Sequence, residues 1–269
     1  MTSKLSQVLA AARAEERAAL IGYLPAGFPS VEGGIKAVNA LLEGGCDVVE
    51  VGLPHSDPVL DGPTIQTADD IALRGGVRIT DVLRTVREVA AAHPVAAVLV
   101  MTYWNPVDRY GTARFAADLA AAGGAGVILP DLPVEESAEW RKAAAEHGLD
   151  TVFVVAPSSQ DKRLAEVTAA GSGFVYAAAV MGVTGSRAQV GELAEDLVAR
   201  TRATTELPVC VGLGVSTGAQ AAQVAGFADG VIVGSAFVQR ILDAGEDEPA
   251  ALAAVRALAA ELAQGVRSR

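Results

Sequence analysis

The chain has 269 residues, of which 51% are apolar and 20% charged, and a formal net charge of −11 at pH 7. This composition is typical of a globular protein with a large core. The acidic balance argues against a nucleic-acid partner, because binding to phosphate backbones needs clustered Lys and Arg.

The cysteines and the N-terminal segment bear on location. Cys46 and Cys210 are far apart and in no metal-ligand spacing, which argues against a disulfide framework and favours a reducing cytoplasm. The first residues lack the apolar core of a signal peptide, and no run reaches about 18 apolar residues. We therefore expect a cytoplasmic protein with no membrane span.

Short apolar runs rich in Val and Ile recur along the chain. Each is apolar nearly throughout rather than alternating, which is the pattern of strands covered on both faces. We predict eight strands, near residues 19–23, 47–52, 95–101, 125–129, 151–155, 173–177, 208–212 and 229–233.

Ala-rich segments with helical spacing lie between these runs. We predict helices at about 31–43, 68–92, 112–122, 135–147, 160–169, 190–204, 216–225 and 248–265, and an extra helix at 3–14 that closes the bottom of a barrel. Eight strand–helix alternations predict a parallel sheet, and the length suits a (β/α)8 TIM barrel of about 250 residues. The chain is thus predicted to be one α/β domain, 1–269. An open doubly wound sheet is the alternative, but no G-x-G-x-x-G follows the first strand.

Glu50 lies inside an otherwise apolar strand, in the run VVEVG. Burying a carboxylate costs free energy unless the group is paired or becomes neutral through a raised pKa. A structural Glu bonded to backbone or to a hydroxyl is the simpler explanation. We favour a general acid/base, because barrel chemistry takes place at the C-terminal ends of the strands and position 50 is close to one.

The loop 53–64 that follows is long for a barrel and dense in polar groups, which suggests a second catalytic group. Asp57 is explained equally well by a local turn before a proline. Asp61 begins an Asp-Gly-Pro turn that re-aims a carboxylate, but it also suits the cap of a helix that begins at Pro63.

Two common kinds of active site are disfavoured. Glu50, His55, Asp57 and Asp61 match no standard ligand pattern, so no metal is expected. A Schiff-base aldolase, or a lysine-anchored pyridoxal phosphate, needs an amine in the barrel mouth. All four lysines fall in the N-terminal segment or on predicted helices: Lys4, Lys36, Lys142 and Lys162.

Aromatic residues and glycine-rich turns also lie at strand ends. Tyr103 and Tyr176 end the third and sixth strands, where each suits the core as well as a ligand contact, and Tyr23, at the end of the first strand, is expected to line an apolar pocket. Glycine turns follow the last three strands, and barrels often hold a phosphate there, on backbone N–H groups and a helix N-terminus. These turns are at 181–186, within a loop that runs to about residue 190, at 212–216, and at 234–236, where a short helix is expected to start.

The run VEVGLPHSDPVLDGPTIQTA resembles the signature of the tryptophan synthase α subunit family. PDLPVEES, the GVTG turn, the GLGVS turn and the IVGSA segment also resemble that family and occur in its order. The resemblance covers essentially the whole chain. The long first motif is highly specific, whereas the glycine turns are shared with other phosphate-binding barrels.

The resemblance implies a lyase of tryptophan biosynthesis that cleaves indole-3-glycerol phosphate to indole and glyceraldehyde 3-phosphate in a retro-aldol reaction. The family's catalytic Glu and Asp fall on Glu50 and Asp61. The cleavage must protonate the indole C3 and deprotonate a glycerol hydroxyl, and one carboxyl that alternates its protonation state, Glu50, can serve both steps. Asp61 would accept the indole N–H as positive charge builds. The predicted substrate contacts are Tyr103, Tyr176, Thr184, Gly185, Gly214, Gly234 and Ser235.

The resemblance also implies a β subunit that carries pyridoxal phosphate and receives indole through a tunnel in an αββα heterotetramer. No cofactor is then expected in this chain. The loop 53–61 and the region near Asn105 and Asp131 would face the partner, and the 178–190 loop would close as a lid. Position 55 departs from the family pattern, since His stands where many members have an aromatic such as Phe, and Pro130 replaces a more usual small residue.

Two other functions remain open at this stage. One is another phosphate-binding barrel, such as a sugar-phosphate isomerase or indole-glycerol-phosphate synthase, although the latter would be expected to use a barrel-mouth lysine. The other is a non-catalytic partner that activates a β subunit. The intact Glu50–Asp61 pair argues against that role.

Overall fold

The fold comes from a computed structural model, which describes residues 2–179 and 187–268, without the side chains of 187–190. The described residues form one nine-stranded parallel sheet in the order β5-β4-β3-β2-β1-β9-β8-β7-β6. The strands are β1 (Ala19–Pro25), β2 (Val48–Gly52), β3 (Ala97–Met101), β4 (Gly126–Ile128), β5 (Asp150–Val152), β6 (Val154–Val155), β7 (Val175–Ala178), β8 (Val209–Gly212) and β9 (Gly230–Val233).

The two ends of this sheet, β5 and β6, follow one another in the chain and are separated only by Phe153. The predicted fifth strand is therefore divided between two neighbours: Val152 accepts a hydrogen bond from Leu129 and Phe153 accepts one from Tyr176. The sheet thus curls round on itself. The predicted (β/α)8 barrel is confirmed, and the open doubly wound sheet is wrong.

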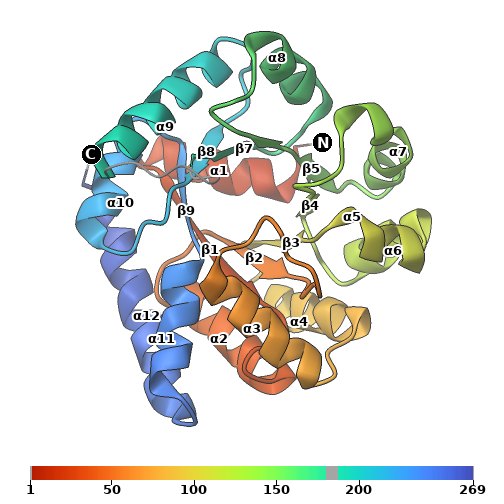
Figure 1. The fold of residues 1–269 in the computed structure, drawn as a ribbon, viewed down its shortest axis with the longest axis vertical. Coiled ribbons are helices and arrows are strands. Elements are labelled where there is room, and N and C mark those ends of the chain that lie inside the picture. Colours follow the sequence, from red (N-terminus) through yellow and green to blue (C-terminus); the bar gives the residue numbers. More distant parts are fainter. Residues whose placement is uncertain (1, 180–186, 269) are drawn as a thin grey trace.

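Helices surround the strands (Figure 1). They are α1 (Lys4–Ala14), α2 (Val31–Glu43), α3 (Pro63–Arg74), α4 (Ile79–Ala92), α5 (Trp104–Tyr110), α6 (Thr112–Ala121), the 3-10 helix η1 (Val134–Glu136), α7 (Ala138–Glu146), α8 (Asp161–Ala170), α9 (Arg187–Arg202), α10 (Gly218–Ala225), α11 (Ser235–Ala244) and α12 (Glu248–Gly265). Among the described residues, no helix is long and apolar enough to cross a membrane.

Three expectations about helices need correction. The segment 68–92 is two helices, because Gly76 adopts a φ of +80° that ends helical geometry after α3. Helix α5 was not predicted, although its proline, Pro106, sits in the first turn, where a missing N–H costs nothing. The loop predicted to run to residue 190 gives way to α9 at Arg187.

Helix α1 confirms the predicted extra helix and closes one end of the barrel. Its buried side chains Leu5, Leu9 and Ala12 join the cluster that fills the barrel interior, together with residues such as Ile21 and Leu99. A Cβ on Gly173, just before β7, would meet Leu5, so the helix packs closely against the N-terminal ends of the strands. The opposite end, where the strands stop, is left for a site.

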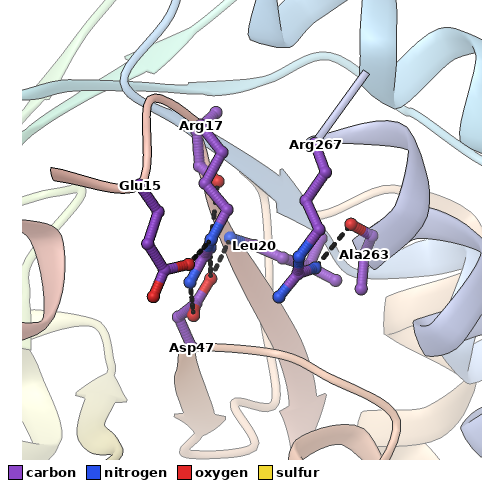
Figure 2. A network of polar contacts seen from close by, with 7 residues as sticks. Glu15, Arg17, Leu20, Asp47, Ala263 and Arg267 are labelled. Carbon is purple, nitrogen blue, oxygen red and sulfur yellow. Dashed lines mark hydrogen bonds and ion pairs between the residues drawn. The ribbon is translucent and has the colours of Figure 1, made fainter. Parts of the chain in front are cut away.

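A buried ion pair holds the first two strands together beside this plug (Figure 2). Arg17 is 7% exposed, and its guanidinium donates to both carboxylate oxygens of Asp47, at 2.7 and 2.8 Å. Asp47 also accepts the backbone N–H of Leu20 at 2.9 Å. The hydrogen bond from Arg17, and to a lesser degree the charge of Arg267 near the C-terminus, keep the pKa of Glu15 below its usual value.

We predict that Arg17→Met destabilises the fold by about 3 kcal/mol, because it leaves the Asp47 carboxylate without its buried partner. Glu15→Gln is the matched control, since Glu15 is solvent-exposed and its loss spares both bonds to Asp47. Urea unfolding of the two variants measures the difference. Equal losses of unfolding free energy would contradict a structural role for the Arg17–Asp47 pair.

Candidate active site

A cavity of about 550 Å³ opens at the C-terminal ends of the strands. Much of its wall is apolar. Six of the predicted site residues line it together: Glu50, Asp61, Tyr176, Gly214, Gly234 and Ser235. Two further predicted contacts, Thr184 and Gly185, lie outside the described residues.

Glu50 is buried in this cavity without a partner. It is 1% exposed, and neither carboxylate oxygen has a hydrogen-bond partner among the described residues. The strand register aligns it with Tyr23 of β1 and with Leu99 of β3, which faces the barrel interior. Burial raises the pKa of Glu50 to about 8, so the carboxyl is mostly protonated at neutral pH. A structural Glu would have a backbone or hydroxyl hydrogen-bond partner, and Glu50 has none among the described residues.

Asp61 reaches the cavity from the loop between β2 and α3. It does not cap the helix, because the N-cap of α3 is Gly62 and has no side-chain capping bond. Instead, the Tyr103 hydroxyl donates to Asp61 Oδ2 at 2.9 Å and accepts the Leu60 N–H at 3.0 Å. Burial raises the pKa of Asp61, while the Tyr103 hydrogen bond and the charge of His55 act in the opposite direction.

Tyr103 lies one hydrogen bond away from the cavity, behind Asp61. It was predicted to touch the substrate, but it does not line the cavity and lies beyond Asp61. The His55 ring packs on it, with ring centroids 4.6 Å apart. Tyr103 is thus bonded to the loop that carries Asp61, at Leu60 and at Asp61 itself.

The other acid of this loop is engaged locally. Asp57 accepts the Ser56 hydroxyl at 2.7 Å and donates its own N–H to His55 Nδ1 at 3.1 Å. Asp57 is exposed, which agrees with a local turn. Within residues 2–179 and 187–268, no three His, Cys, Asp or Glu side chains are grouped so that they could hold a metal ion.

Tyr23 and Tyr176 line the cavity, and each packs against a glycine where a side chain would leave no space for the ring. A Cβ on Gly212, at the end of β8, would lie 2.7 Å from the Tyr176 hydroxyl. A Cβ on Gly52, at the end of β2, would clash with the Tyr23 hydroxyl in the same way. Tyr23 was expected to line an apolar pocket, and it does.

The last two strands supply backbone groups to the cavity. Gly214 adopts a φ of +67°, and the space next to its Cα is open. Gly234 is the N-cap of α11 and Ser235 its first residue, so the N–H groups of these two residues have no partner within the helix. Such groups bind anions without any positive side chain. The expected helix start at Ser235 is confirmed.

Sequence reasoning missed three polar residues at or near the cavity. Gln239 lies one turn after Ser235 and lines the wall. Gln66 and Asp69 lie on α3, next to the Asp61 loop. Asp69 is 3% exposed and falls among the buried apolar residues of that helix, a periodicity visible in the sequence once α3 is bounded correctly.

The lysines do not reach the site. Lys4, Lys36, Lys142 and Lys162 lie on α1, α2, α7 and α8, and none lines the cavity. An amine able to form a Schiff base with a ligand is therefore missing from the described wall.

Comparison with known proteins gives the same family by sequence and by structure. The profile of the family described as "Tryptophan synthase alpha chain" matches residues 9–267. The tryptophan synthase alpha chain of Streptomyces avermitilis is 76% identical over 265 residues, which cover 98% of this chain and 94% of the relative. That of Streptomyces coelicolor is 74% identical over 267 residues, which cover 98% and 97%.

Solved structures are similar over the same length. A chain of tryptophan synthase from M. tuberculosis in its aminoacrylate-bound form matches with a TM-score of 0.89 and 50% identity, covering 98% of this chain and 99% of that one. Tryptophan synthase subunit alpha from Legionella pneumophila matches with a TM-score of 0.90 and 32% identity, covering 99% of each.

We predict that Glu50→Gln stabilises the fold increasingly as the pH rises. The folded-state pKa of Glu50 is raised from 4.5 to about 8, so its contribution to stability is complete below pH 4.5 and is lost as the pH rises to 8. Gln never ionises and keeps that contribution. The stability gain at pH 8 relative to pH 5 should be at most about 4 kcal/mol. Urea unfolding from pH 5 to pH 9 measures it, and a gain that does not change with pH would contradict the raised pKa.

Proposed function

Since the chain belongs to the tryptophan synthase alpha chain family, it is a lyase of indole-3-glycerol phosphate, and we propose that Glu50 and Asp61 carry out the cleavage. The products are indole and glyceraldehyde 3-phosphate. One observation carries the assignment of roles. Glu50 is a buried carboxyl with no hydrogen-bond partner among the described residues, it is mostly protonated at neutral pH, and it lies on the wall of a cavity that it shares with Asp61.

Glu50 moves the protons in this proposal. Its protonated carboxyl donates to the indole C3, which weakens the bond from that carbon to the glycerol chain. The resulting carboxylate then takes the proton of the adjacent glycerol hydroxyl as the carbon–carbon bond breaks and the aldehyde forms. The carboxyl is thereby returned to its starting state, and no second acid is needed.

Asp61 stabilises the charge that this sequence creates. Protonation at C3 places positive charge on the indole ring nitrogen, and a carboxylate that accepts its N–H forms a charge-assisted hydrogen bond. Burial raises the pKa of Asp61, and the Tyr103 hydrogen bond opposes this rise and so favours the ionised form that the role requires. The two acids thus differ in role because their surroundings differ.

The apolar wall and the backbone N–H groups of the cavity match the indole ring and the phosphate of the substrate. Apolar side chains such as Ile65, Met101 and Ile232 offer a surface for the indole ring, and Tyr176 would lie near the glycerol. The open N–H groups at Gly214, Gly234 and Ser235 would bind the phosphate. We propose that Thr184 and Gly185 complete this phosphate site, as the family resemblance implies.

The chain acts with a β subunit in this proposal, in an αββα heterotetramer. Pyridoxal phosphate belongs to that subunit, and this chain uses no cofactor of its own. The exposed Val59, in the 53–61 loop, supports placing this loop at the contact. We propose a cytoplasmic location, which the free, buried Cys46 and Cys210 support.

Two other functions were considered from the sequence: another phosphate-binding barrel enzyme and a non-catalytic partner of a β subunit. Membership of the family excludes a sugar-phosphate isomerase or indole-glycerol-phosphate synthase. A merely activating partner would have no use for an unpaired carboxyl at the centre of its barrel, since that group destabilises the fold at neutral pH.

Glu50→Gln should retain the fold and the affinity for glycerol 3-phosphate but lower kcat for indole release by about 10²–10⁴-fold, because Gln cannot exchange protons. For the unsubstituted chain, kcat/KM should fall as the pH rises through about 8, where Glu50 loses the proton that it must donate. An indole-release assay with and without the β subunit measures both. Unimpaired cleavage by Glu50→Gln would contradict the role of Glu50 as the proton donor and acceptor.

Asp61→Asn should lower kcat by about 10²–10³-fold, since it removes the anion that faces the indole nitrogen. Asp70→Asn is the matched control, because Asp70 is an exposed acid of α3 whose partner is Arg74. Single-turnover indole release from both variants measures the difference. Equal rates in the two variants would reduce Asp61 to a structural residue.

A further inference from the structure

Helix α3 runs directly after the loop that carries Asp61, and two of its side chains reach back to that loop. Gln66 and Asp69 are three residues apart, which places them on one side of the helix on consecutive turns. Neither has a part in the chemistry proposed above. Both side chains contact the loop that carries Asp61, and these contacts suggest a role for each.

Gln66 closes the turn that presents Asp61. Its side-chain Nε2 donates to the backbone carbonyl of Asp61 at 2.8 Å and lies 3.5 Å from the carbonyl of Pro58. The Asp61 N–H also donates to the Pro58 carbonyl, at 3.0 Å. One amide therefore reaches the first and last residues of the turn, while the Tyr103 hydroxyl holds the Asp61 carboxylate itself.

Asp69 lies near the other end of the loop. It is 3% exposed on the buried stripe formed by Ile65, Ala68 and Ala72, and its Oδ1 has no hydrogen-bond partner among the described residues. Burial and the charge of Asp61 raise the pKa of Asp69 to about 7, and a hydrogen bond from the His55 backbone lowers it. The carboxyl is thus close to both His55 and Asp61.

An acid at this position is costly for the helix. Burying a carboxyl with an unsatisfied oxygen costs free energy that an apolar side chain would not. Leu would continue the stripe without that penalty. The cost is explained if the group serves the loop rather than the packing of the helix.

We propose that Gln66 and Asp69 are positioning residues that hold the loop at its two ends, His55 and Asp61, and so set the Asp61 carboxylate against the substrate. The inference rests on the role proposed for Asp61. Helix α3 then acts as a template for the loop, and the α3 side chains act on the reaction only through Asp61.

The first test is Gln66→Met, which keeps the length of the side chain and removes the amide. It should lower kcat about tenfold while KM and the affinity for glycerol 3-phosphate change less than about twofold, because a misplaced group costs rate rather than binding. The measurement uses the chain together with its β subunit. Thr67→Ala is the matched control, since the Thr67 hydroxyl donates to the Pro63 carbonyl within the helix and not to the loop that carries Asp61. Gln66 is exposed, so its replacement spares the core.

The second test compares Asp69→Leu with Asp69→Asn. Leu removes the acceptor for the His55 N–H and should slow kcat about tenfold, yet it should make the fold more stable, because it completes the apolar stripe. Asn keeps a carbonyl acceptor and should restore kcat to within about threefold. A purely structural Asp69 predicts the reverse for Leu, a loss of stability with kcat unchanged in the folded fraction.

The outcomes separate this inference from the proposed function. Wild-type kcat in both Gln66→Met and Asp69→Leu, beside an impaired Asp61→Asn, would overturn the inference and leave the role of Asp61 standing. Unimpaired Asp61→Asn would instead overturn the proposed function. Each of the two α3 variants decides its own end of the loop, so the Gln66 result stands even if Asp69→Leu does not fold.

Discussion

The burial of one carboxyl without a partner governs the rest of this site. The pKa of Glu50 is raised because its carboxyl is buried and has no hydrogen-bond partner among the described residues. The sheet surrounds the carboxyl at the sides, and α1 closes the barrel from below. Substrate entry is then confined to the C-terminal ends of the strands, where the cavity lies.

The two acids are held in contrasting ways. Glu50 belongs to a strand whose neighbours on both sides are in register, so its position follows from the sheet. Asp61 belongs to a loop and depends on side chains from elsewhere, chiefly Tyr103 and residues of α3. In the proposed function, the proton donor needs a dry, rigid setting, whereas the group that would approach the indole nitrogen can lie on a loop.

The sequence predicts those parts of the molecule that depend on local pattern. The strands were predicted because apolar runs covered on both faces stand out, and Glu50 was conspicuous as the exception within one of them. The predicted helix 68–92 begins five residues after the true start of α3 at Pro63 and runs past the break at Gly76. With these bounds, the buried stripe that contains Asp69 is not recognisable. The role of Tyr103 had no local signal, since its bond to Asp61 joins residues 42 positions apart.

Strand β1 pairs on one side with β2 and on the other with β9, the last strand of the chain. The ring of strands can therefore close only when β9 has paired with β1, and a Glu side chain that is exposed to water before that closure is ionised at neutral pH. Closure of the ring expels that water, and the carboxyl takes up a proton. Uptake of a proton by Glu50 is thus linked to the folding of the barrel.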